Sequence, residues 1–148
     1  MDLTEYTKDT LRGLIGVVVV IETIKPDAEA DGLSISELQT DVELKLVQGG
    51  IRVLPHSEWC QTPGRPWLYV SVNTIKHLGS YFFSVDVQLK QDVNLPHQPS
   101  IVTSSATWEL GSIGFAKTDL LRAKIRESVG AYVDNFINDY SAVNYRPH

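Results

Sequence analysis

The sequence predicts an α+β protein, a two-layer sandwich in which two helices cover one face of a mixed sheet in the order β-α-β-β-β-β-α. Apolar and polar residues alternate over residues 67–75, 81–95 and 101–110, which is the period of a strand. Apolar residues recur at helical spacing over 34–48 and 119–143. The run LIGVVVVI at 14–21 fills both faces of a strand, as in a central strand that is covered on both sides.

The first half of the chain is expected to form a right-handed βαβ unit. Residues 14–24 are predicted to be a strand, which ends at Pro26 because proline has no N–H to give to a sheet. A helix over 34–48 follows, and residues 51–54 resume as a strand. Strand, helix and strand joined by short connections favour this unit.

The signals around the first long helix concern its ends and its packing. Ser34 is a good N-cap, and Glu37 three residues later completes a capping box. Leu33 and Leu38 flank the cap as a hydrophobic staple. Gly49-Gly50 predicts a left-handed stop. The stripe expected to face the core consists of Ile35, Leu38, Val42 and Leu46.

The second half predicts a hairpin, one more strand and a long helix. Residues 67–75 and 81–95 should pair as an antiparallel hairpin around a turn at 77–80. After a loop at 95–100, residues 101–110 are predicted to be a strand with Ala106, Trp108 and Leu110 on the core side, and GSIGFAK at 111–117 is predicted to be a connector. The last helix is expected to start at Thr118 or Asp119, and its stripe consists of Leu121, Ile125, Val129, Val133, Phe136, Ile137 and Tyr140.

Length and composition indicate one soluble globular domain over residues 13–148, preceded by a polar, flexible arm at 1–12. The 148 residues are 43% hydrophobic and 21% charged, with a net charge of −5. Lys and Arg cluster only at 117–126, which argues against nucleic acid as a partner. The apolar run at 14–21 is too short for a transmembrane segment, and MDLTEYTKDT ahead of it does not resemble an export signal.

Residues that carry chemistry are sparse. His56, Glu58 and Cys60 lie in one predicted loop, and they are the best seed for an enzyme site, with Cys60 as nucleophile and His56 as base. A zinc site would need further ligands from His77 or His97, each in a separate loop. The sequence therefore predicts no catalytic set, no metal and no cofactor. Cys60 is the only cysteine, so no disulfide can form within the chain.

Acidic pairs on the two helices do not form a site either. Asp41 and Glu43 would point about 200° apart on a helix, so Asp41 is expected to support Lys45 one turn later. Asp134 and Asp139 are expected to be solvated.

Aromatic residues give the candidate binding surfaces. Trp59, Arg65 and Trp67 lie within WCQTPGRPWLY at 59–69, and aromatic residues with arginine are enriched at interfaces. The same residues would also fix a proline-rich loop to the core. Tyr69 and Phe82 are expected on the sheet face that the helices leave uncovered, on paired strands where the two rings could meet. They either cover each other or centre a contact for a protein partner or a second copy of the chain.

The order GVVVVIE, GLSISELQTDVELKL, GGIRVL, WLYVSV, FFSVDVQLKQDV, ATWELG and VDNFINDYSAVN, across residues 11–144, resembles that of a group of uncharacterised bacterial proteins of similar size. Members of that group often begin with an export signal, which implies the bacterial envelope. The layout is also similar, more loosely, to the amino-terminal domain of the Tol translocation protein and to the curli-export lipoprotein, where a helix and strands form a binding module. The shared motifs are structural and carry over no active site.

Two functions follow as hypotheses. The first is a non-enzymatic binding or assembly module, periplasmic or envelope-associated if an export signal was removed from the chain and cytoplasmic otherwise. The alternative is a small enzyme built around His56, Glu58 and Cys60. Convergence of two or more of these residues with His77 or His97 in one pocket would favour the enzyme.

Overall fold

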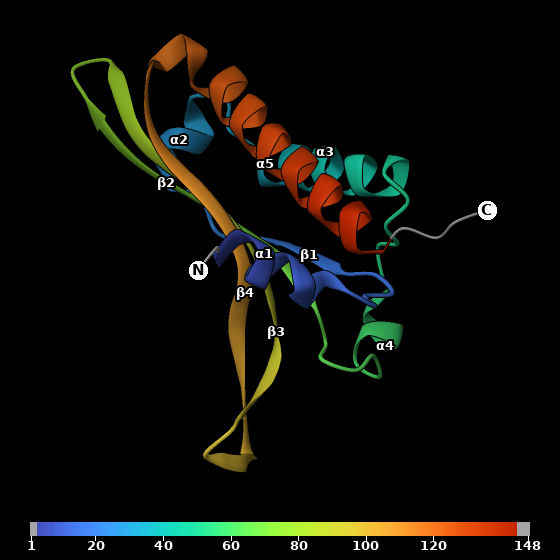
Figure 1. The fold of residues 1–148 in the computed structure, drawn as a ribbon. Helices are drawn as coiled ribbons and strands as arrows, with labels where there is room; N and C mark the ends of the chain where they lie inside the picture. The colour runs from blue at the N-terminus through green and yellow to red at the C-terminus, as the bar shows by residue number, and fades with distance from the viewer. Residues whose placement is uncertain (1–2, 145–148) are drawn as a thin grey trace.

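The computed structural model describes residues 3–144 and shows a four-stranded mixed sheet with its two long helices packed on one face (Figure 1). Strand β1 (Val18–Ile21) runs parallel to β2 (Trp67–His77). Strands β2, β3 (Ser80–Leu95) and β4 (Gln98–Lys117) then form an antiparallel meander, so the sheet order is β1-β2-β3-β4. The predicted α+β class, the mixed sheet and the long hairpin are confirmed.

Two long helices, α3 (Ile35–Gln48) and α5 (Leu121–Val143), pack against each other and cover the same side of the sheet (Figure 1). The shorter helical segments are α1 (Leu3–Lys8), α2 (Pro26–Ala30), α4 (His56–Trp59) and the 3₁₀ turns Asp9–Leu11 and Thr118–Leu120. Helices α2 and α4 are not predicted from the sequence. Both begin at or directly after a proline, which is a common helix start.

Helix α3 begins and ends as its sequence predicts. The Ser34 hydroxyl accepts a hydrogen bond from the Glu37 N–H at 3.2 Å, which satisfies one free donor of the first turn. At the other end Gly50 has a φ of +83°, and the Ile51 N–H bonds the Leu46 carbonyl at 2.9 Å. The Glu37 carboxylate bonds Arg122 on α5, so it ties the two helices together.

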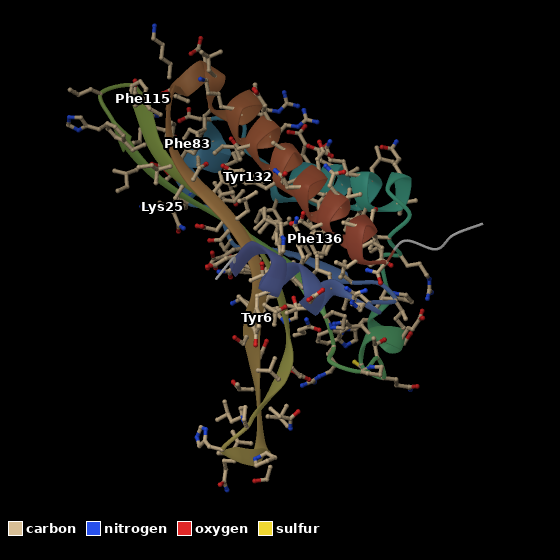
Figure 2. All side chains as sticks on the ribbon, in the orientation of Figure 1. Tyr6, Lys25, Phe83, Phe115, Tyr132 and Phe136 are labelled. Carbon is tan, nitrogen blue, oxygen red and sulfur yellow. The ribbon has the colours of Figure 1, made fainter. Side chains whose placement is uncertain are left out.

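The core lies between the helices and the inward side chains of the sheet. Alternate residues of β2 and β3 are buried as predicted, and Phe136 of α5 packs with Trp108 of β4 at a centroid distance of 5.2 Å. Figure 2 shows Phe136 between α5 and the sheet. The buried apolar residues from the two middle strands and the two long helices are Leu68, Val70, Val72, Tyr81, Phe83, Val85, Val87, Leu89, Leu38, Val42, Leu46, Leu121, Ile125, Val129, Val133 and Phe136.

The predicted strand at 51–54 is reduced to one bridge. Val17 pairs in parallel with Val53, through the Val17 N–H to the Arg52 carbonyl and the Leu54 N–H to the Val17 carbonyl. The pairing cannot continue because α4 starts directly after Pro55 and turns the chain away. Strand β1 therefore forms its parallel ladder with β2, which follows α4 in the sequence, and not with residues 51–54.

Strand β4 is longer than predicted. Residues 111–117, expected as a connector, belong to the strand and pair with residues 80–86 of β3. A bulge leaves Thr107 unpaired, because Leu89 faces Trp108 while Lys90 faces Ala106. The bulge reverses the alternation below it, so Ala106 is exposed rather than in the core. The hairpin end around 92–104 extends beyond the helices (Figure 1).

The predicted arm at 1–12 is folded wherever the structure describes it. Residues 3–11 are helical, and the side chain of Leu11 is fully buried in the core. The end of α5 closes over this segment: Asn144 donates to the Leu11 carbonyl at 2.9 Å and accepts from the Gly13 N–H at 2.8 Å. Residues 1 and 2 lie outside the described part of the chain.

Candidate functional site

A shallow hollow of about 450 Å³ opens on the sheet face that the helices leave uncovered, and we call it the aromatic hollow. It lies at the Trp67 end of β2, where β1, α4 and the loop before β2 come together. Three of the five predicted binding residues, Trp59, Arg65 and Trp67, line it. The full lining consists of Val18, Val20, His56, Trp59, Arg65, Trp67, Asp92 and Ser104.

The two tryptophans of the hollow are held in place by contacts with the neighbouring backbone. Trp59 closes the short helix α4, and its indole N–H donates to the Pro66 carbonyl at 3.0 Å. Trp67 is the first residue of β2 and pairs with Val18 of β1. Trp59 and Trp67 are both half-buried, so each ring presents part of its surface to solvent on a rigid support.

Arg65 is held in a strained backbone conformation at the rim. It has a φ of +38°, which is uncommon for a residue other than glycine. Its Nε donates to the Asp92 carboxylate at 2.7 Å, and this pair raises the pKa of Arg65. The guanidinium carbon lies 5.7 Å from the centroid of the Trp59 ring. Strain of this kind gathers at functional sites, where the surrounding contacts sustain it.

Cations of the chain itself lie against the aromatic rings beside the hollow. The Lys90 ammonium lies 5.1 Å from the Trp67 centroid and 4.6 Å from the Tyr69 centroid, and the two rings meet edge to face at 5.3 Å. Because Lys90 and Arg65 already use these rings, a cationic ligand would compete with them. The hollow therefore suits an apolar ligand group better than a cationic one.

Tyr69 is built into the sheet by its hydroxyl. Burial, followed by a hydrogen bond to Glu22, raises the pKa of Tyr69. The pKa of Glu22 is lowered, first by the hydrogen bond from Ser71 and then by the one from Tyr69. This network anchors Tyr69 beside the hollow.

Tyr69 and Phe82 do not meet, so that part of the prediction is wrong. Tyr69 faces Gln88 across the hairpin, whereas Phe82 faces Ile75 six residues further along β2, about 20 Å away at strand spacing. Phe82 packs instead on Phe115 of β4, with ring centroids 5.2 Å apart. The two aromatic residues belong to opposite ends of the open face.

A second exposed surface, which we call the apolar tip, surrounds Phe82. It consists of Ile75, Leu78, Phe82, Ile113 and Phe115, which are exposed by 65%, 89%, 56%, 87% and 52%. Figure 2 shows Phe115 at the end of the sheet beside the β2–β3 turn. Ile113 and Phe115 were missed because GSIGFAK was interpreted as a connector, although its alternating Ile and Phe carried the strand signal.

The residues of the enzyme alternative are only partly brought together. His56 Nε2 and Cys60 Sγ lie 3.4 Å apart at the edge of the aromatic hollow. Glu58 turns to Arg52, which donates to it at 2.8 and 2.9 Å and lowers its pKa. His77 ends β2 and His97 lies in the β3–β4 turn, and both are away from this pair. Within residues 3–144 no group of three or more His, Cys, Asp or Glu is placed to hold a metal ion.

Comparisons of the chain with models of protein families, with curated proteins and with solved structures gave no match. The similarity to a bacterial protein group and to the two envelope domains therefore stays a prediction. None of the helices within residues 3–144 combines the length and apolar character that crossing a membrane requires.

Proposed function

We propose that this chain is a non-enzymatic protein-binding module that docks a partner on the open face of its sheet, at the aromatic hollow. The observation that supports this most directly is the hollow itself. Its volume of about 450 Å³ falls in the range of ligand sites, and its wall is mainly apolar with two indole rings and one ion pair at the rim.

The composition of the hollow matches that of an interaction hot spot. Tryptophan, tyrosine and arginine dominate the energy of most protein interfaces when they are fixed before binding. Here Trp59 is fixed by Pro66, Arg65 by Asp92 and Trp67 by Tyr69 and Lys90. The partner should insert an apolar side chain between the indoles and place a polar group against the Arg65–Asp92 pair.

A peptide library displayed on phage tests this proposal. Peptides selected on the wild-type protein should be enriched in apolar or aromatic anchors, and their binding should fall at least about tenfold on Trp67→Ala and on Trp59→Ala, since hot-spot truncations cost over 1 kcal/mol. Phe82→Ser at the apolar tip is the matched control and should retain binding. Peptides that bind all four proteins equally would place recognition elsewhere and contradict the proposal.

The enzyme alternative has one observation in its favour, the contact between the Cys60 thiol and the His56 imidazole. A nucleophilic cysteine needs such a base, and the base in turn needs an orienting group. Glu58, which the sequence offered for that task, is engaged by Arg52. Cys60→Ser should leave fold and peptide binding unchanged. Selective labelling of Cys60 by a mild alkylating agent at neutral pH, abolished in His56→Ala, would favour the enzyme instead.

A further inference from the structure

We infer that a second copy of this chain pairs with the outer edge of β4, in an antiparallel register centred on Ile113. The inference concerns the end of the sheet opposite the aromatic hollow and does not depend on the function proposed for that hollow. It rests on an unprotected strand edge, on self-complementary side chains and on the apolar tip beside them.

Strand β4 is the last strand in the sheet order, and among residues 3–144 its ladder partner is β3 alone. Half of its backbone N–H and C=O groups therefore point away from the sheet. Natural proteins protect such an edge with proline, charge, bulges or a covering segment. The lower half of β4 has Pro99 and the bulge at Thr107, whose carbonyl accepts from Thr10 of the N-terminal segment.

The upper half of β4 lacks that protection in its sequence. Residues 110–116 read LGSIGFA, without charge or proline, and this stretch carries the exposed Ile113 and Phe115. Tyr132 of α5 contacts Ser112 from the helix side, whereas Ile113 and Phe115 on the outer face are exposed to solvent. An exposed, uncharged, apolar edge is a template for pairing with another strand.

The side chains of this segment fit their own two-fold image. In a register centred on Ile113, residue numbers on opposite strands add to 226, so Glu109 faces Lys117 of the second copy, and Lys117 faces its Glu109. Glu109 and Lys117 are the charged residues of 109–117, and both belong to the outer face with Ile113. Opposite charges placed directly across a ladder stabilise it, and like charges destabilise it.

The uncharged positions fit as well. Ile113 faces itself at the two-fold axis, and Phe115 faces Gly111 of the second copy, a position without a side chain, beside which the Asp86 carboxylate of that copy lies. On the helix side Ser112 faces Gly114 and Leu110 faces Ala116, so each pair includes one glycine or alanine. The pairing would bring the apolar tips of the two copies together. Phe82 and Phe115 of each copy would then belong to one continuous apolar surface.

The register is tested by charge reversal with size-exclusion chromatography and light scattering. Wild type should have the mass of two chains. Glu109→Lys and Lys117→Glu should each be monomeric, because each places two like-charged pairs across the axis. An equimolar mixture of these two variants should again give dimers, since each charged pair across the axis then joins a lysine of one chain to a glutamate of the other. The double variant Glu109→Lys, Lys117→Glu should be dimeric on its own.

A cysteine at the axis gives a second measurement. In a Cys60→Ser background, Ile113→Cys should form a disulfide-linked dimer on mild oxidation, because the two side chains lie directly opposite each other. Ile101→Cys, on the other half of β4, is the matched control and should stay unlinked. A wild-type mass of one chain would overturn the inference. A dimer that the single charge reversals leave intact would also overturn it, because the copies would then meet through another surface.

Discussion

Arg126 on α5 donates two hydrogen bonds to the carboxylate of Asp41 on α3, from Nε at 2.8 Å and from Nη2 at 3.0 Å. The expected partner of Asp41, Lys45, bonds Asp134 of α5 instead. With Glu37 and Arg122 one turn earlier, these pairs form a row of charges between the helices. Asp139, also expected to be solvated, accepts from the Trp108 indole at 2.9 Å.

The first prediction concerns the acid stability that this row supplies. Arg126 holds the pKa of Asp41 below its ordinary value, and Arg122 does the same for Glu37. A carboxylate with a lowered folded-state pKa stabilises the fold above its unfolded pKa, about 4, and loses this effect as the pH falls through the folded pKa. Asp41→Asn should therefore flatten the loss of stability below about pH 5, measured by urea melts across pH.

A double-mutant cycle with Arg126→Met separates the ion pair from the packing. The two substitutions should be less than additive at pH 7 and should come closer to additive as the pH is lowered through the folded-state pKa of Asp41. Full additivity at pH 7 would mean that the pair does not contribute to stability.

The second prediction concerns the start of α3. Ser34→Ala should lower the free energy of unfolding by about 1 kcal/mol, because it removes the acceptor for the Glu37 N–H. Leu38→Ala should cost about 2–5 kcal/mol, since Leu38 is 1% exposed and its loss leaves a cavity. Guanidinium melts measure both, and a neutral Leu38→Ala would contradict the packing of α3.

The third prediction concerns the turn between β2 and β3. Leu78 and Gly79 have φ of +50° and +76°, which is the pattern of a type I′ turn, where asparagine is favoured in place of leucine. Leu78→Asn should raise stability by about 1 kcal/mol. Leu78→Ala, which keeps the backbone strain, is the control and should change stability little. Equal melting temperatures for the two variants would show that the turn stores no strain.

The fourth prediction concerns a buried hydroxyl. Thr74 is 2% exposed, and its Oγ1 is the buried side-chain polar atom that lacks a hydrogen-bond partner within residues 3–144. Thr74→Val keeps the shape and removes the unpaired group, so it should raise the free energy of unfolding by about 1 kcal/mol. Thr74→Ala should lower it because it leaves a cavity. A destabilised Thr74→Val would indicate that the hydroxyl has a partner after all.

The parts of the fold that the sequence predicts are those with local causes. The cap at Ser34, the stop at Gly50 and the alternation of β2 and β3 depend on neighbours within a few residues. The extent of β4 depends on neighbours far along the chain. Gly114 looks like a break, yet it is glycine in a continuous strand because an added Cβ would lie 2.5 Å from the Phe83 ring across the ladder.

The candidate site also has one part that depends on residues close in sequence and one part that depends on distant strands. Trp59, Arg65 and Trp67 were predicted together because they are close in sequence, and they do share one hollow. Asp92 and Ser104 complete that hollow from β3 and β4, and only the pairing of the strands brings them there. The contact between Phe82 and Phe115 also depends on strand pairing. Phe115 belongs to the part of β4 that was predicted to be a connector.

The contact between Asn144 and the Leu11 carbonyl determines when the N-terminal segment can complete its packing during synthesis. Leu11 enters a site that α5 helps to build, so the segment around Leu11 cannot reach its final packing until the end of α5 has been synthesised. During that interval the meander of β2, β3 and β4 can form from its own neighbours, while the part of its helix-facing side that α5 covers stays exposed to solvent. The nascent chain therefore exposes apolar surface until α5 has been synthesised as far as residue 144.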